Sequence, residues 1–163
     1  MTSKAQYSWQ DNICILKLTG EVRFTDCPSI DKFIKSVLAH ENHQMLVDLS
    51  ETTLLDSTAL GMLAQIAIKA REQQKTSPTL SIQNNDLRVL LQSVCFDRVF
   101  SIIQISEEAN VEDFSILDPI DSNDDELALQ VLKAHKNLMQ LSFGNQLNFH
   151  DVLDALDKQA CAN

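Results

Sequence analysis

Glycine and proline are both scarce in this chain of 163 residues, which contains three of each. Few tight turns are therefore available, so helices should dominate the structure. No apolar run approaches the ~20 residues that cross a bilayer. The N-terminus, MTSKAQYSWQD, also has no apolar stretch of the signal-peptide type. We expect a cytoplasmic protein with one main hydrophobic core, because the length is short for two.

Paired cysteines are also missing. The four cysteines are Cys14, Cys27, Cys95 and Cys161, and none forms a C-x-x-C pair. Neither a zinc site nor a disulfide framework is supported by this spacing. We interpret Cys14 and Cys95 as small core residues and Cys161 as an exposed thiol of the tail. The sequence predicts no metal and no cofactor.

A surplus of basic residues is absent, and the net charge is −10. Residues 1–105 hold 11 acidic and 10 basic residues, whereas residues 106–163 hold 12 acidic and 3 basic ones. Nucleic acids and anionic membranes each need a basic face, so we expect neither as a partner. The acidic tail could meet a basic partner surface or could serve only to keep the protein in solution.

Signatures of catalysis are missing as well. Leu55 stands where a G-x-S-x-G nucleophile elbow around Ser57 would have its first glycine, and no glycine-rich phosphate loop is present. His40 and His43 stand beside Glu41 at a polar helix end, where exposed histidines are ordinary. The other two histidines, His135 and His150, have no second ligand at metal-binding spacing. We predict that the protein is not an enzyme.

Hydrophobic periodicity predicts alternating strands and helices. The predicted strands are Tyr7–Gln10, Ile13–Thr19, Met45–Leu49, Leu80–Gln83 and Val99–Ile105. The predicted helices are Cys27–Leu38, a second one that starts near Ser57 and is broken at Ser77-Pro78, and a third one from Asp86. Asp11-Asn12 should form a two-residue hairpin turn, and Ser50–Ser57 a loop. This order predicts an α/β fold, with a mixed, mostly parallel sheet of four to five strands and helices packed on it.

The last third of the chain differs from this body. Residues 106–125 are polar and acidic and read as a linker, and residues 126–163 as a helical extension. One helix is predicted to about Leu141, stopped by Gly144-Asn145, and a second short one near Phe149–Leu156. The apolar sides of these helices need a partner surface. They could dock on the same chain, which we favour, pair between two chains in a homodimer, or remain mobile until a partner arrives.

The start of the second helix has two notable features. Asp56, Ser57 and Thr58 are all N-cap residue types, so this helix terminus should offer free N–H groups and a positive partial charge that accommodate a phosphate. Further along, Met62 and Ile66 lie on an apolar strip beside the main buried face. The strip is either a docking surface or packs under the C-terminal helices or a neighbouring loop, and both interpretations stay open.

Several segments in the same order resemble a known family. An apolar strand ends in Asp48-Leu49, and Asp56-Ser57-Thr58-Ala59-Leu60-Gly61 opens a helix. Leu18–Glu21 and the Asp97-x-x-Phe100 turn agree with the same pattern. Together they resemble the sulfate-transporter and anti-sigma-factor-antagonist (STAS) domain, over about residues 5–105. The resemblance implies a STAS domain over residues 1–105 with the α/β fold described above.

The resemblance also implies a function in bacterial partner switching. In anti-sigma factor antagonists of this family, the serine after the aspartate is phosphorylated by an anti-sigma factor that is itself a serine kinase. A metal-dependent serine phosphatase restores the form that binds the anti-sigma factor. By this resemblance Ser57 is the phosphoacceptor, with Thr58 as second choice, and Asp56 is its neighbour at the contact surface. Together with the apolar strip, this gives the predicted partner-binding residues: Asp56, Ser57, Thr58, Ala59, Met62 and Ile66. The alternative is an accessory subunit of a membrane transporter.

Two positions depart from the family pattern. Ala59 stands where many members have glycine, which is a mild change. Cys95 stands where a glycine often ends the late helix, and a left-handed conformation there would cost a non-glycine residue ~1 kcal/mol or more. Either the turn differs in this chain or the cost is tolerated.

Overall fold

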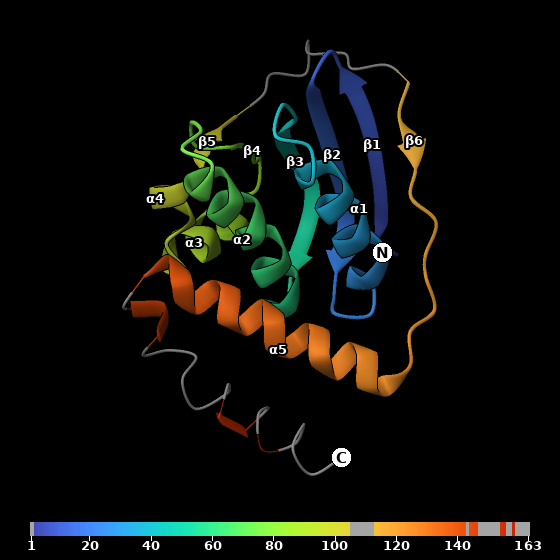
Figure 1. Cartoon of the computed structure of the whole chain (residues 1–163), viewed down its shortest axis with the longest axis vertical. Helices are drawn as coiled ribbons and strands as arrows, with labels where there is room; N and C mark the ends of the chain where they lie inside the picture. The colour runs from blue at the N-terminus through green and yellow to red at the C-terminus, as the bar shows by residue number, and fades with distance from the viewer. Residues whose placement is uncertain (1, 105–112, 143, 147–153, 156–157, 159–163) are drawn as a thin grey trace.

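The computed structural model describes residues 2–104, 113–142, 144–146, 154–155 and 158. Its strands are β1 (Lys4–Gln10), β2 (Ile13–Val22), β3 (Gln44–Leu55), β4 (Thr79–Ser81), β5 (Ser101–Ile103) and β6 (Ser115–Ile116). Its helices are α1 (Cys27–Leu38), α2 (Ser57–Glu72), α3 (Asn85–Ser93), α4 (Phe96–Val99) and α5 (Asp124–Leu141). Figure 1 shows their arrangement.

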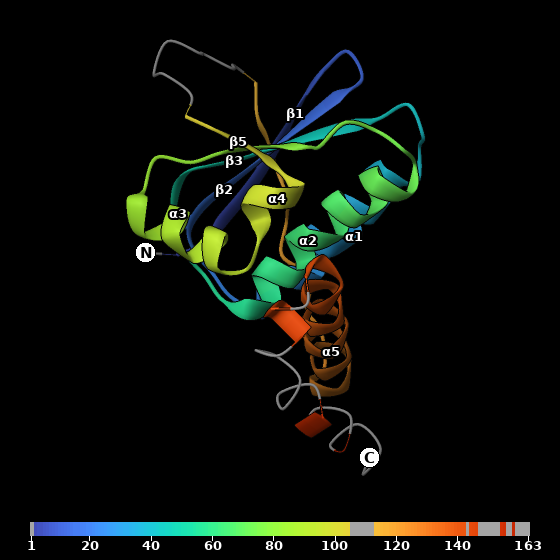
Figure 2. The ribbon, with the colours of Figure 1, turned by 90° about the vertical axis from the view of Figure 1, so that its left-hand side faces the viewer.

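The strands form one six-stranded sheet in the order β5-β4-β3-β2-β1-β6. The pairs from β2 to β5 are parallel, whereas β1 pairs antiparallel with both β2 and β6. In Figure 2, α1, α2 and α4 lie together on one side of this sheet. The predicted α/β class with a mixed, mostly parallel sheet is confirmed. The sheet has one strand more than the expected four to five.

The sheet begins with the predicted hairpin. Asp11 takes a φ of 55° between β1 and β2, a conformation that aspartate and asparagine tolerate better than most residues. The Asn12 side chain then donates to the Asn42 carbonyl oxygen at 2.9 Å, and the Gln44 amide donates to the Asn12 carbonyl oxygen at 3.0 Å. The hairpin turn is thereby tied to the start of β3.

Strand β3 is longer than the sequence suggested. It continues to Leu55, where Leu54 and Leu55 pair with Glu21 and Val22 of β2. The prediction of a loop over Ser50–Ser57 is therefore wrong. The register between β2 and β3 shifts twice, and one of the shifts lies beside Gly20. A β-bulge of this kind places an extra residue in one strand while the two strands stay paired on either side of it. Helix α2 thus begins directly after the strand.

The core lies between the sheet and its helices. Leu16, Val47 and Leu80 are register partners on three adjacent strands, and all three are fully buried. Tyr7 of β1 points the same way and packs on Phe33 of α1, with ring centroids 4.6 Å apart. Burying each such side chain contributes about 1.5–3 kcal/mol, so this row fixes the sheet under α1 and α2.

The backbone conformation of Cys95 decides between a different turn at this position and a tolerated left-handed one. Cys95 adopts a left-handed conformation, with φ 65° and ψ 23°, between α3 and α4. The turn therefore keeps the geometry that favours glycine, and the chain tolerates the strain. The Cys95 thiol donates to the Ser142 hydroxyl oxygen at 3.2 Å, so this turn also contacts the segment after α5.

The segment expected to be a linker contributes the sixth strand. Ser115 and Ile116 of β6 pair with Tyr7 and Gln6 of β1, and the Leu117 amide donates to the Ala5 carbonyl oxygen at 2.9 Å. The chain thus runs along the free edge of β1 before it reaches α5 (Figure 1). The division of the chain at residues 105 and 125 stays a prediction.

Helix α5 begins at a capping box. The Asn123 side chain accepts from the Glu126 amide at 2.8 Å, and the Glu126 carboxylate accepts from the Asn123 amide at 3.2 Å. The helix ends at Leu141 and lies against α2 of the same chain, as we expected. Its buried residues include Leu132, Ala134, His135, Leu138 and Leu141. The second helix predicted near residues 149–156 lies almost entirely outside the described residues.

Candidate functional site

Asp56 positions the start of α2 through both oxygens of its carboxylate. Oδ1 accepts from the Ala59 amide at 2.8 Å as the N-cap of the helix. Oδ2 accepts from the Phe24 amide at 2.7 Å in the loop after β2. The Asp56 amide itself donates to the Val22 carbonyl oxygen at 3.2 Å. This residue therefore ties the helix terminus to the end of the neighbouring parallel strand.

Ser57 is the first residue of α2 and is half-buried. Its neighbours Thr58 and Ala59 are buried, with Thr58 only 3 % exposed. Of the two hydroxyl groups that the sequence proposed for phosphorylation, Ser57 is thus the more exposed. Because the helix terminus carries a positive partial charge, it lies where negative charge is favoured.

The Ser57 hydroxyl contacts a residue that the sequence reasoning did not place at the site. Ser57 Oγ lies 3.0 Å from His135 Nε2 of α5, across 78 positions of sequence. His135 Nδ1 lies 2.7 Å from the Val131 carbonyl oxygen, one turn earlier in α5. A carbonyl oxygen only accepts, so Nδ1 carries the hydrogen. In the neutral ring, Nε2 is then the acceptor for the hydrogen of the Ser57 hydroxyl.

This arrangement places a base beside a hydroxyl, which is the first requirement of nucleophilic chemistry. In a catalytic triad a carboxylate holds the histidine as the third group. Here a main-chain carbonyl oxygen, that of Val131, takes the place of the carboxylate. His135 is only 4 % exposed, so α5 would have to move before another molecule could reach the imidazole ring. The sequence offered one signal for this contact: a histidine on the apolar side of the predicted helix, between Leu132 and Leu138.

Comparison with known protein families identifies the body of the chain. A family model described as "Mlab, STAS domain" matches residues 5–100, which is more than half of the chain. The chain belongs to the STAS domain family. Helix α5 and its contact with Ser57 lie outside the matched residues.

The fold has a counterpart of known structure. An anti-sigma factor antagonist from Mycobacterium paratuberculosis superposes with a TM-score of 0.55 at 18 % sequence identity. The match covers 66 % of this chain and 89 % of that one. The likeness supports the STAS fold. A comparison with curated protein sequences gave no significant match.

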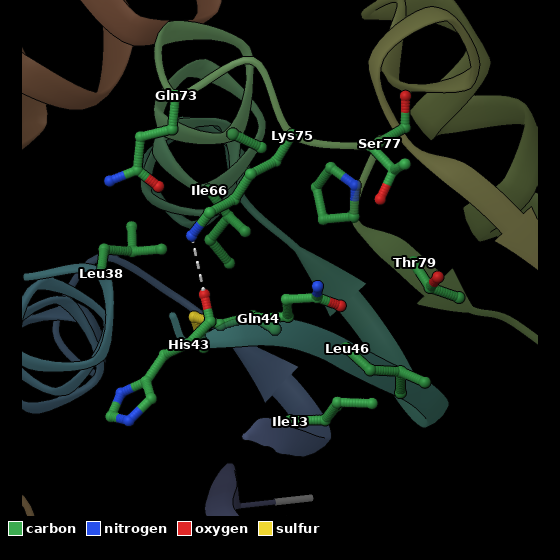
Figure 3. A pocket seen from close by; sticks show the side chains of 14 residues that line it. Ile13, Leu38, His43, Gln44, Leu46, Ile66, Gln73, Lys75, Ser77 and Thr79 are labelled. Atoms are coloured by element: carbon green, nitrogen blue, oxygen red, sulfur yellow. Dashed lines mark hydrogen bonds between the residues drawn. The ribbon is translucent and has the colours of Figure 1, made fainter. Parts of the chain in front are cut away.

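The apolar strip of the STAS domain is buried. Met62 is 2 % exposed and lies in the groove between α1 and α5, where Ala134 is also found. Ile66, about one turn further along α2, is 1 % exposed and lines a cavity of about 150 Å³ (Figure 3). In this arrangement Met62 packs under the C-terminal helix and Ile66 faces the sheet. Neither side chain is free to contact another protein.

The cavity itself lies at the far end of α2 from Ser57. Ile13, Leu46 and Thr79 line it from the sheet, and Gln73 and Lys75 from the end of α2 (Figure 3). Lys75 Nζ donates to the His43 carbonyl oxygen at 3.1 Å, and both residues line the cavity (Figure 3). The cavity is therefore separate from the serine site.

Metal and thiol chemistry find little support in the described parts of the chain. No cluster of three or more histidine, cysteine, aspartate or glutamate residues suited to a metal occurs there. Burial raises the pKa of the Cys14 thiol to about 12, and burial, reinforced by the nearby Asp56 carboxylate, raises that of Cys27. Both thiols therefore stay protonated at neutral pH.

None of the described helices is long and apolar enough to span a membrane.

Proposed function

We propose that this protein is an anti-sigma factor antagonist whose binding is controlled by phosphorylation of Ser57. The observation that carries this proposal is the place of Ser57 in a STAS domain, as the first residue of α2 behind the Asp56 cap. Its partners would be an anti-sigma factor with serine kinase activity and a metal-dependent serine phosphatase. The structural neighbour, itself titled an anti-sigma factor antagonist, supports the same role.

The charge distribution explains why one phosphate would act as a switch. The STAS domain, residues 1–105, has a net charge near zero because 11 acidic and 10 basic residues nearly cancel. A phosphoserine adds about −1.5 to −2 charges at pH 7. Close to the Asp56 carboxylate, this charge would repel an acidic partner surface and resist desolvation. The helix terminus would tolerate it, so binding would be lost without loss of the fold.

The test compares binding of the cognate anti-sigma factor to Ser57→Ala and Ser57→Asp. We expect Ser57→Ala to bind as the unphosphorylated protein does and Ser57→Asp to bind at least tenfold more weakly. Ser36→Asp is the matched control, because Ser36 is an exposed serine on the outer side of α1. Equal affinity of Ser57→Asp and Ser36→Asp would refute the switch.

The matching family model is described as "Mlab, STAS domain" and does not name an anti-sigma factor. A role as accessory subunit in a membrane transporter complex is therefore the second candidate. Co-purification separates the two roles: a transporter ATPase recovered with the tagged chain, in place of a kinase-like protein, would favour the second.

A further inference from the structure

Helix α5 covers the part of α2 on which the proposed function depends. His135 Nε2 lies 3.0 Å from Ser57 Oγ, and Asn137 Nδ2 donates to the Gly61 carbonyl oxygen at 3.2 Å. Ser57 and Gly61 are about one helical turn apart on α2. The two contacts therefore join α5 to the first turns of α2. Figures 1 and 2 show the two helices lying against each other.

Gly61 allows the two helices to meet backbone to backbone. A Cβ atom built on Gly61 would overlap the Ala134 carbonyl group and would lie 2.6 Å from the Ala134 Cα atom. No side chain could occupy position 61 while α5 lies in this place. The same position on an uncovered helix would accept alanine readily, because alanine is the better helix former. The absence of a side chain at Gly61 therefore permits the close approach of α5.

The C-terminal end of α5 is held on a second part of the domain. Leu138 is fully buried in the main core. Asn145, just beyond the helix, donates through Nδ2 to the Leu138 and Val94 carbonyl oxygens, both at 2.8 Å. Val94 precedes the left-handed turn at Cys95, so this contact closes that turn as well. Helix α5 is thus docked along its C-terminal half, from Leu132 to Leu141.

The contact between α5 and α2 includes polar groups as well as apolar ones. His135 is buried there and bonds to Ser57, and Asn137 bonds to the Gly61 carbonyl. Surfaces that separate during function are more polar than those that form one permanent core. Water replaces such hydrogen bonds when the helix leaves, so their loss adds little to the free energy of release.

We infer that α5 is an intramolecular competitor for the Ser57 surface, so that both the kinase and the anti-sigma factor gain access only when α5 lifts from α2. The inference rests on the proposed function. A partner that distinguishes a serine from a phosphoserine must approach Ser57 Oγ closely, and His135 occupies that approach. A kinase must bring its phosphate donor to the same atom. With α5 docked, each partner would have to displace His135 from the Ser57 hydroxyl.

Thiol labelling tests whether α5 covers this surface. Ser57→Cys is made in the full chain and combined either with Gly61→Ala, which α5 cannot accommodate, or with Gly144→Ala. The latter is the matched control, since a Cβ there meets only the Ser142 hydroxyl at 3.7 Å. After treatment with N-ethylmaleimide, mass spectrometry maps the modified positions. We expect position 57 to react at least tenfold faster with Gly61→Ala than with Gly144→Ala.

Cys14 and Cys27 report on unfolding in the same sample, because both are fully buried. They should stay unmodified while position 57 reacts. Leu138→Asp, which disfavours docking from the side of α5, is a second and independent variant. Equal labelling at position 57 in all variants would overturn the inference. So would labelling of Cys14 and Cys27 in both releasing variants, because α5 would then be an inseparable part of the core.

Phosphorylation tests the functional half of the inference. Unphosphorylated full-length chains with the natural Ser57 are added to an extract of the native cells with Mg-ATP, and the initial rate of phosphate gain at Ser57 is measured. We expect Gly61→Ala to gain phosphate several-fold faster than Gly144→Ala. Equal rates would overturn autoinhibition and leave the proposed function intact. Absence of phosphate in every variant would instead count against the proposed function and the inference together.

Discussion

Replacing Asp56 by alanine should destabilise the protein by about 2 kcal/mol. The N-cap bond to the Ala59 amide, at 2.8 Å, contributes about 1 kcal/mol by comparison with other capping residues. The bond to the Phe24 amide, at 2.7 Å, is charge-assisted but exposed, so after screening it contributes about 1 kcal/mol more. Asp56→Asn keeps one acceptor oxygen and should lose about half of the total.

Urea unfolding followed by circular dichroism measures this series. With a slope of about 2 kcal/mol per molar urea, the midpoint should fall by roughly 1 M for Asp56→Ala and by roughly 0.5 M for Asp56→Asn. Asp121→Ala is the control, because Asp121 is exposed and lies outside any helix or strand. A midpoint for Asp56→Ala equal to that of the control would show that the carboxylate does not hold the helix terminus.

Three further predictions concern residues away from the site. Cys95→Gly should raise the melting temperature by roughly 2–4 °C, because glycine removes about 1 kcal/mol of left-handed strain; a lower melting temperature would contradict the assigned turn. Gly20→Ala should lower the melting temperature by at least roughly 2–4 °C, since φ at Gly20 is 79° and the new Cβ would lie 2.8 Å from the Thr2 carbonyl oxygen. The stability of the wild type should be complete below about pH 8.5, where an unfolded thiol is still protonated, and fall as the pH rises toward 12, the raised pKa of Cys14. Cys14→Ala should reduce that fall in urea titrations between pH 8 and 10, and an unchanged pH dependence would argue against it.

Local patterns predicted much of the STAS domain. The spacing of apolar residues placed α1 at Cys27–Leu38, the bounds that the structure gives. The hairpin turn at Asp11 followed from residue chemistry. The extension of β3 to Leu55 did not, because bulged pairing with β2 depends on the neighbouring strand and leaves no regular alternation in the sequence. Strand β6 was missed for a related reason: two residues carry no periodicity.

The serine site could be predicted only in part. The Asp56-Ser57 pair is local, and its helix-terminal position followed from N-cap preferences. The contact with His135 spans 78 positions and depends on how α5 docks, which no local pattern specifies. The apolar strip at Met62 and Ile66 left two interpretations open, and in this structure Met62 is buried in the groove beside the chain's own helix α5.

Phosphate on Ser57 is the most direct measurement of the central claim. The chain would be isolated from its native cells under growth and under stress, and its intact mass and peptide fragments would be determined by mass spectrometry. The account predicts a fraction that carries one phosphate, mapped to Ser57, and that changes between the two conditions. Absence of phosphate under both conditions, or a phosphate confined to another residue, would contradict it.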